Sequence, residues 1–281
     1  MRPNGWHLTD DIDDFLGRAG DFLRSRPALH NTPLTAIEKL RIRGADASGG
    51  TVFGRLESAG EVRAVCYVRP TRRLTVTALS PEQADTLAAH LVGLGHAVSG
   101  VVADHDTATA FAQAQQRHAG AASAPTWRAR LYRLGTLTPP EPVPAGRGRV
   151  VDERAQLLRW CGEFVAAVGE TPAVDADSWA ASRFGDKHFT FWETPDGTPV
   201  SMAGSTPMVG GMVRVDPVYT PAHLRGRGYA GAVTVEASRA ALAGGATDVV
   251  LFADPANATS NALYRRIGYV RVADFTGYDF S

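Results

Sequence analysis

Residues Val218–Gly231 read VYTPAHLRGRGYAG, the end of a strand, a glycine-rich turn and the start of a helix. The first backbone N–H groups of a helix have no partner within it, and the helix dipole places partial positive charge there. Gly226 and Gly228 have no side chains that would hold a ligand off the backbone, and Arg225 and Arg227 add positive charge. The stretch therefore predicts a cradle for a pyrophosphate group.

A dinucleotide-binding loop is one alternative interpretation of this stretch. Residues 226–231 spell G-x-G-x-x-G, and Asp248 follows about 20 residues later, as that fold would require. However, the first Gly of that fold follows its strand directly, whereas here 221–225 intervene, beginning with a proline that cannot donate to a strand ladder. The chain after Gly231 has room for two more strands but not for a doubly wound sheet. A P-loop is excluded because no Gly-Lys-Ser/Thr follows. These points disfavour both the dinucleotide-binding loop and the P-loop.

The C-terminal half has alternating periodicities that predict a mixed α/β order. Asp196-Gly197 between two apolar runs indicates a hairpin, and Gly244-Gly245 ends an Ala-rich helix. We predict helices over 151–168, 175–182, 229–243 and 257–267, and strands over 188–194, 199–207, 212–220, 248–253 and 269–275.

The N-terminal half repeats this order of elements. We predict helices over 9–23, 33–41, 81–94 and 107–118, and strands over 51–57, 61–68, 74–78, 97–102 and 127–134. The two halves barely match residue by residue, so an internal duplication rests on element order alone. Residues 134–148 (LGTLTPPEPVPAGRG) are dense in Pro and Gly and predict a semi-rigid connector. The expected domains are therefore 1–137 and 149–281, joined by a linker over 138–148.

Composition narrows the class of protein. The 281 residues are 44% hydrophobic and 21% charged, which suits about two domains with their own cores. The 29 basic and 29 acidic residues cancel, which disfavours a non-specific nucleic-acid binder. No apolar run is long enough for a membrane helix, and the acidic N-terminus does not resemble a signal peptide. Cys66 and Cys161 lie far apart in apolar surroundings and are expected to be buried thiols of a cytoplasmic protein. No metal site is expected, because no Cys/His cluster has zinc spacing.

Two motifs resemble those of a known family. Arg225-x-x-Gly228-x-Ala230 resembles the R/Q-x-x-G-x-G/A signature of the GNAT acetyltransferases, and 257–269 (NATSNALYRRIGY) is similar to the end of a GNAT domain. The chain most closely resembles bacterial tandem GNAT proteins with a degenerate N-terminal GNAT-like domain. The clear resemblance covers about 199–280, and over 1–145 it rests on element order. It implies an α/β (α+β) fold of two GNAT-like domains, each with a mixed, mostly antiparallel sheet flanked by helices.

The resemblance also implies roles for individual residues. The strand that ends at Thr220 would splay from the next one and pair with the pantetheine arm of acetyl-CoA, and Asn257 would bond that arm near the thioester. Tyr264 would be the catalytic acid that protonates the departing thiolate. The implied coenzyme-binding residues are Val218, Tyr219, Thr220, Arg225, Gly226, Arg227, Gly228, Tyr229, Ala230, Gly231, Asn257 and Asn261.

Tyr264 also suits that role on physical grounds. A phenol with a pKa near ~10 stays protonated at neutral pH and can act as a general acid. Tyr264 and Asn257 are seven residues apart, which is two helical turns, so both face the same side. A core tyrosine and a helix N-cap asparagine would give the same pattern.

The group that takes the proton from the acceptor amine is left open. The candidates are Glu193, Asp216, His223 and Asp254, and each could equally be a solvated or turn-shaping residue. A water chain could replace a direct base, because the main task is to position an amine at a reactive thioester.

The acceptor pocket and the N-terminal half carry weaker signals. Aromatic residues are available to line a pocket, although such residues more often lie in a core: Trp160, Trp179, Phe184, Phe191 and Trp192. In the N-terminal half, Leu79-Ser80-Pro81-Glu82-Gln83 replaces the glycine-rich turn. Pro and Glu suit a helix start but oppose a pyrophosphate, so we expect that half to bind no coenzyme A.

The sequence thus predicts an acyl-CoA-dependent N-acyltransferase of class EC 2.3.1.-, which transfers acetyl from acetyl-CoA to a primary amine by direct attack. The acceptor would be a small-molecule amine or a peptide, with no membrane partner and no metal. One alternative is a transferase that uses a longer acyl-CoA or an aminoacyl-tRNA. Another is a coenzyme A-binding module without turnover. The acceptor and the oligomeric state stay open.

Overall fold

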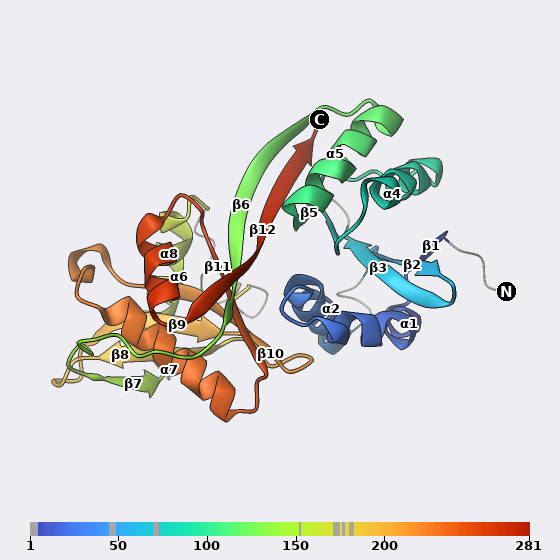
Figure 1. Cartoon of the computed structure of the whole chain (residues 1–281). Coiled ribbons are helices and arrows are strands. Elements are labelled where there is room, and N and C mark those ends of the chain that lie inside the picture. The colour runs from blue at the N-terminus through green and yellow to red at the C-terminus, as the bar shows by residue number, and fades with distance from the viewer. Residues whose placement is uncertain are drawn as a thin grey trace. The chain divides into compact units, whose positions relative to one another are not determined.

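The computed structural model describes residues 5–44, 49–69, 73–151, 153–170, 175, 178–179 and 183–281 (Figure 1). The chain divides into two compact units. The first comprises Met1–Leu131 and Val272–Ser281, and the second comprises Tyr132–Arg271.

The first unit is a mixed sheet with helices on both faces. Figure 1 shows α1 and α2 on one side of its strands and α4 and α5 on the other. The strand order is β1-β2-β3-β4-β5-β12, where β12 is Tyr269–Phe280 near the C-terminus, and neighbours are antiparallel except for the parallel pair β4–β5. The elements are β1 (Gly5–Thr9), α1 (Ile12–Ser25), α2 (Asn31–Arg43), β2 (Val52–Ser58), β3 (Glu61–Val68), β4 (Leu74–Val76), α4 (Pro81–Gly93), β5 (Gly100–Asp104), α5 (His105–Ala119) and β6 (Ser123–Leu134).

Helix α4 of this unit begins with a complete capping box. The Ser80 hydroxyl accepts from the Gln83 N–H, and the Gln83 side chain accepts from the Ser80 N–H. Apolar residues of α4 and α5 pack on one face of the sheet. On the other face, Phe15 of α1 contacts Phe53 of β2, with ring centroids 5.2 Å apart.

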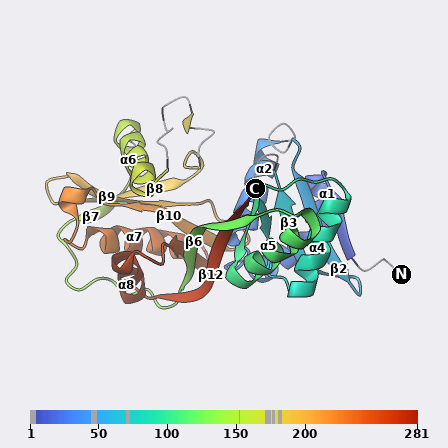
Figure 2. The same cartoon turned by 90° about the horizontal axis from the view of Figure 1, so that it is seen from above.

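The second unit has the same kind of sheet. Its strand order is β7-β8-β9-β10-β11, antiparallel except for the parallel pair β10–β11. Figure 2 shows α6 on one face and α7 and α8 on the other. The elements are β7 (Arg147–Val150), α6 (Arg154–Ala167), β8 (His188–Glu193), β9 (Pro199–Ser205), β10 (Met212–Tyr219), the 3₁₀ turn η2 (Ala222–Leu224), α7 (Tyr229–Ala243), β11 (Asp248–Ala253), α8 (Ala258–Arg266) and β12 (Tyr269–Phe280).

Each face of this second sheet is covered by its own hydrophobic core. Under α6, Trp160 and Cys161 pack with Phe191, Met202 and Tyr219. On the opposite face, the apolar side of α7 packs with strand residues and with Tyr264 of α8. Because successive strand side chains point to opposite faces, the same strands serve both cores.

The compact units differ from the expected domains at two places. The first unit ends at Leu131 rather than at 137, and it includes 272–281, which we expected in the second domain. The reason is pairing: Phe275–Asp279 of β12 form an antiparallel ladder with Asp104–Gly100 of β5. The last strand of the chain therefore completes the sheet of the first unit, while Tyr132 of β6 lies in the core of the second.

Most elements lie where the sequence predicts them. Strands β3 and β11 and helix α7 have the predicted bounds, and, apart from the second helix of the C-terminal half, the described elements follow the same order in both halves. The sequence did not reveal β1 and β7, the leading strand of each half. β7 has the sequence RGRV, is mostly exposed and lacks apolar alternation, so it is formed by pairing with β8. The predicted helix over 175–182 falls mainly outside the described residues.

Candidate functional site

Strand β10 separates from β11 after a short parallel ladder. Met212–Arg214 pair with Asp248–Val250, and the ladder goes no further within these two fully described strands. On the other side of β10, the register against β9 shifts between Val215 and Val218. The second half of β10 can therefore accept an extended ligand along the side that faces β11.

Beyond β10, the chain forms an uncapped entrance to α7. Gly226 and Gly228 have φ values of +79° and +81°, a region that side chains other than Gly rarely adopt. Gly228 is the N-cap residue of α7, and no side chain caps the helix. The first N–H groups of α7, from Tyr229 onward, thus lack helical acceptors and face the turn. An uncapped helix start of this kind leaves main-chain donors available to an anion.

The polar groups around this cradle are partly engaged within the loop. The Arg225 Nε donates to the Thr220 carbonyl at 3.0 Å, and the Arg227 guanidinium donates to a loop carbonyl at 3.4 Å. The Ser201 hydroxyl donates to the Tyr219 carbonyl at 3.0 Å. The Tyr219 hydroxyl donates to Glu163 of α6 at 2.7 Å, and burial together with Glu163 raises its pKa to about 12. Two of the carbonyls predicted to meet the pantetheine arm therefore already accept a bond.

The proline-rich connector runs alongside the cradle. A Cβ atom on Gly228 would lie 3.7 Å from the Pro144 ring, and one on Gly231 would lie 3.8 Å from Pro140. The same added Cβ on Gly231 would lie 3.0 Å from a methyl group of Leu263. Gly231 thus permits close packing of α7 against α8, a role that its place in the motif did not reveal.

The two predicted asparagines lie at the start of α8 with different surroundings. Asn257 is the N-cap residue, and its side-chain oxygen accepts from the Ser260 N–H at 3.0 Å. Asn261 is 2% exposed; its NH2 group donates to the Asp254 and Asn257 carbonyls at 2.7 Å each, and its oxygen accepts from Tyr132. The Asn261 amide is therefore engaged within the protein through both its nitrogen and its oxygen.

Tyr264 lies near the far end of α8, on the face that packs toward the sheet. Its side chain is buried between the rings of Tyr132 and Tyr269, with centroids 6.3 and 6.1 Å away. Burial, and then the negative charge of Asp216, raise the pKa of Tyr264 above its ordinary value. Both effects keep the phenol protonated, which is the state that a general acid requires.

Among the four candidate bases, Asp216 is the one whose charge acts on Tyr264. It lies where the register of β10 shifts, and its side chain is 32% exposed. The Lys187 ammonium donates to its main-chain oxygen at 2.8 Å and to its carboxylate. Burial opposes ionisation of Asp216, but the charges of Lys187 and Arg214 and the Lys187 hydrogen bond hold its pKa well below the usual range.

Of the other three candidate bases, two have local side-chain partners and one is exposed. Glu193 is buried and accepts from the Arg149 guanidinium at 2.6 Å. Asp254 accepts from the Ala256 N–H at 2.8 Å and shapes the turn before α8. His223 is exposed on η2. The structure therefore gives Glu193 an ion-pairing role and Asp254 a turn-forming role.

The predicted pocket aromatics and the two cysteines are core residues. Trp160, Phe184 and Phe191 lie in the α6 core, Trp192 lies in the core under α7, and Trp179 packs at the edge of the α6 core. Cys66 and Cys161 are buried free thiols, as the sequence predicts, and burial raises the pKa of each to about 12. Neither thiol is suited to act as a nucleophile.

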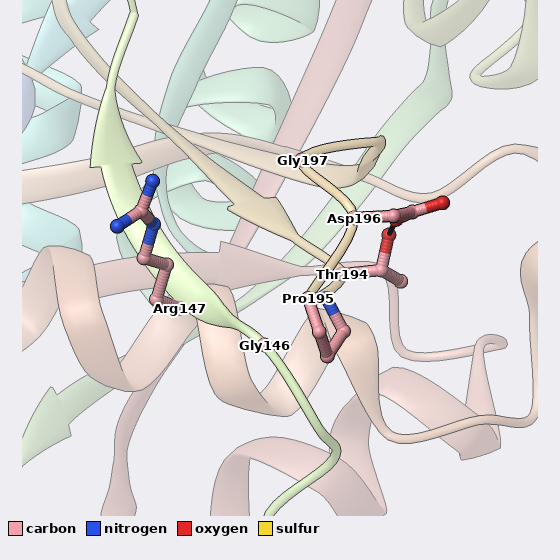
Figure 3. A pocket seen from close by; sticks show the side chains of 6 residues that line it. All are labelled: Gly146, Arg147, Thr194, Pro195, Asp196 and Gly197. Carbon is pink, nitrogen blue, oxygen red and sulfur yellow. Dashed lines mark hydrogen bonds between the residues drawn. The ribbon is translucent and has the colours of Figure 1, made fainter.

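A hollow of about 430 Å³ lies beside the β8–β9 turn (Figure 3). It is lined by Gly146, Arg147, Thr194, Pro195, Asp196 and Gly197, and no predicted site residue is among them. The Asp196 carboxylate accepts hydrogen bonds from Thr198 and Thr194 within the turn. Figure 3 shows the Arg147 side chain pointing away from the Asp196 carboxylate. The polar groups of this hollow thus serve the turn itself.

The described residues contain neither a metal-binding cluster nor a membrane-spanning helix. No group of three or more His, Cys, Asp or Glu side chains there could hold a metal ion. No helix in those same ranges is both long and apolar enough to cross a bilayer.

The uncapped α7 entrance, the splayed strands and the tyrosine on α8 lie within a match to a known family. Residues 154–269 match the model of the Acetyltransferase (GNAT) family. This confirms the resemblance inferred from the sequence. No curated protein matches the chain.

Solved structures confirm the fold over the whole chain. A GCN5-related N-acetyltransferase from Sphaerobacter thermophilus is 19% identical, with 99% of this chain and 96% of that chain covered and a TM-score of 0.60. A tandem GNAT protein from the clavulanic acid biosynthesis pathway is 14% identical, with 98% of each chain covered and a TM-score of 0.56. A GCN5-related N-acetyltransferase from Kribbella flavida is 21% identical, covers 77% of this chain and 86% of its own, and has a TM-score of 0.51. The fold is the predicted one, with two GNAT-like domains of mixed, mostly antiparallel sheets flanked by helices.

Proposed function

We propose that the chain is an N-acyltransferase that transfers acetyl from acetyl-CoA to a primary amine by direct attack, in class EC 2.3.1.-. The observation that carries this proposal is the uncapped entrance of α7, with Gly228 in the left-handed conformation, next to the splayed ends of β10 and β11. The match of 154–269 to the GNAT family model supports an acyl-CoA donor.

The cradle would hold the coenzyme through the main chain. The N–H groups from Gly226 to Gly231 would donate to the pyrophosphate, with Arg225 and Arg227 supplying charge. The main-chain groups of 218–220 that Ser201 and Arg225 leave available would pair with the pantetheine arm like an added strand. Asn257 uses its side-chain oxygen for the helix cap, so its NH2 group is the part that would donate to the arm.

The chemistry needs one proton donor and no covalent enzyme intermediate. The acceptor nitrogen attacks the thioester carbonyl carbon, the carbon–sulfur bond breaks, and the departing thiolate takes a proton from the Tyr264 hydroxyl. The attacking nitrogen loses a proton to solvent, and the Tyr264 phenolate is reprotonated from solvent. The raised pKa of Tyr264 makes this return of the proton favourable.

We propose that the first unit binds no coenzyme A. In that unit, the helix that corresponds to α7 is α4, and its first turn is capped by the side chains of Ser80 and Gln83 and begins with Pro81. These groups occupy the N–H donors that a pyrophosphate would need. A cytoplasmic location is consistent with two unpaired thiols.

Titration calorimetry and a thiol-release assay test the proposal. We expect one molecule of acetyl-CoA bound per chain, and release of free coenzyme A thiol with at least one member of a panel of small amines and peptides. Tighter binding of a longer acyl-CoA would show that this compound, and not acetyl-CoA, is the donor. Salt-sensitive use of an aminoacyl-tRNA would likewise identify the tRNA as the donor. Binding without turnover across the panel would leave a coenzyme A-binding module, and no heat with any form of coenzyme A would overturn the proposal.

A further inference from the structure

A buried lysine lies at the break in the sheet. Lys187 comes immediately before β8, and its side chain is only 4% exposed. Its ammonium group donates to the main-chain oxygen of Asp216 at 2.8 Å and also to the carboxylate of the same residue. Lysine is almost never fully buried without a partner, because an unpaired ammonium loses its hydration. This pairing is therefore a built feature of the unit.

The lysine binds the part of β10 that opens the sheet. Asp216 lies between Val215 and Val218, where the register against β9 shifts and beyond the last pair with β11. By holding both the carbonyl and the side chain of Asp216, Lys187 fixes the bulge from two directions. A substrate thioester laid between the splayed strands would pass close to this point.

Charged and titratable groups from several elements face the pair. Arg214 of β10 and Arg183, which precedes β8, act on both members. The charge of Asp216 contributes to the raised pKa of Cys161 on α6 and of Tyr264 on α8. The Lys187 ammonium also lies 5.4 Å from the centroid of the Phe184 ring, within the range of a cation–π contact.

The ion pair between Lys187 and Asp216 sets the charge that an approaching acceptor amine would experience. An unpaired carboxylate beside the thioester would stabilise the ammonium form of the acceptor, which has no lone pair for attack. A carboxylate whose pKa is held far below neutrality would also be a poor acceptor of the amine proton. Paired with Lys187, Asp216 instead presents a hydrogen-bonded carboxylate whose charge is offset by the ammonium group.

We propose that Lys187 is a positioning residue of the transferase: it anchors the β10 bulge and cancels the charge of Asp216, so that the acceptor amine reaches the thioester unprotonated. This inference rests on the proposed function. It differs from a mechanism in which Asp216 is the general base, because it assigns the proton of the amine to solvent.

Three variants of the full chain test the inference through the pH profile of kcat/KM, and a fourth, Asp216→Asn, tests through kcat whether Asp216 is a general base. Lys187→Met keeps the bulk of the side chain and removes its charge. We expect its acidic limb to move upward by about one pH unit or more, because the unpaired carboxylate favours the ammonium form. Lys187→Arg keeps the charge and should restore most of the wild-type profile. The double variant Lys187→Met/Asp216→Asn removes both charges and should return the limb to its wild-type position, with kcat within about tenfold of the wild-type value.

The outcomes separate this inference from the proposed function. If Asp216 is the general base, Asp216→Asn and the double variant lose about 100-fold or more in kcat at every pH, and the inference is overturned. A folded Lys187→Met variant with an unmoved acidic limb overturns it as well, while the wild-type activity leaves the proposed function standing. A wild-type chain that neither binds acetyl-CoA nor releases thiol overturns both.

Discussion

The Tyr132 hydroxyl of β6 donates a hydrogen bond of 2.8 Å to the side-chain oxygen of Asn261 on α8. The Asn261 NH2 group donates in turn to the main-chain oxygens of Asp254 and Asn257. These bonds tie the end of β6, the turn after β11 and the helix that carries Tyr264 into one arrangement. The position of the proposed acid thus depends on residues that themselves need no contact with the coenzyme.

Replacement of Tyr132 by Phe should destabilise the second unit. The substitution leaves the buried Asn261 oxygen without its donor, which costs about 1–3 kcal/mol. Urea unfolding followed by pulse proteolysis, with mass spectrometry of peptides from 132–271, measures the loss. Tyr278→Phe is a control in the first unit, where the hydroxyl contacts Thr109 at a part-buried site. An unfolding free energy equal to that of the wild type would show that the bond carries no stability.

Gly228→Ala should weaken the binding of coenzyme A by about tenfold or more. A Cβ at φ +81° strains the turn by about 1 kcal/mol and shifts the N–H groups that begin α7. Titration calorimetry with acetyl-CoA gives the change in Kd, and thermal unfolding gives the change in stability.

Gly197→Ala is a matched control for that variant. Gly197 has φ +85° in the β8–β9 turn, and a Cβ there meets no atom within 4 Å. The backbone strain is therefore comparable, while the α7 entrance is untouched. Equal losses of affinity in the two variants would mean that strain alone, and not the cradle, accounts for the Gly228 result.

Tyr264→Phe should lower kcat by about 100-fold or more and leave the Kd for coenzyme A nearly unchanged. The substitution removes the proton donor but keeps the buried ring. Tyr269→Phe is the control, because its hydroxyl bonds Ser238 at 2.7 Å and has no proposed role in the chemistry. Stopped-time thiol release at saturating acetyl-CoA gives kcat for each variant. Turnover at the wild-type rate in Tyr264→Phe would remove Tyr264 as the acid.

The local pattern of the sequence predicts much of the fold and the cradle. Helix α7 has the predicted bounds because its Ala-rich run is bracketed by Gly228 and Gly244. Strand β11 has the predicted bounds because its short apolar run is buried on both faces of the sheet. The uncapped α7 entrance follows from glycines that are visible in the sequence. These features depend on neighbours along the chain.

The missed features depend on partners far along the chain. Asn261 matched the family pattern, but its role is set by Tyr132, 129 residues away. Lys187 gave no signal, because a lone lysine is expected at the surface and its partner Asp216 lies 29 residues further on. The proximity of Pro144 to Gly228 is likewise a tertiary fact. Site residues held by long-range polar contacts are thus the part that sequence alone does not supply.

Removal of 272–281 should destabilise the first unit more than the second. The deletion takes away the antiparallel partner of β5, including Phe275 and Thr276, which are buried. We expect limited proteolysis to cut first within 5–131, while acetyl-CoA still binds the remaining 132–271 region. Phe275→Ala is a milder version, with an expected loss of about 3–5 kcal/mol. Protease resistance of 5–131 equal to that of the full chain would show that β12 contributes little to this sheet.

The stability of the first unit should fall as the pH drops below about 6.5, because of His30. His30 is 5% exposed, its Nδ1 lies 3.1 Å from the Leu23 carbonyl oxygen, and its ring stacks on Phe22. Burial lowers the pKa of His30 in the folded chain, so the unfolded chain binds more protons in this range. Its contribution is therefore complete above the unfolded pKa and is lost as the pH falls toward the folded pKa. The free energy of unfolding, measured with urea between pH 8 and pH 5, should fall less in His30→Gln than in the wild type. An equal fall of this free energy in the variant and the wild type would contradict the assignment.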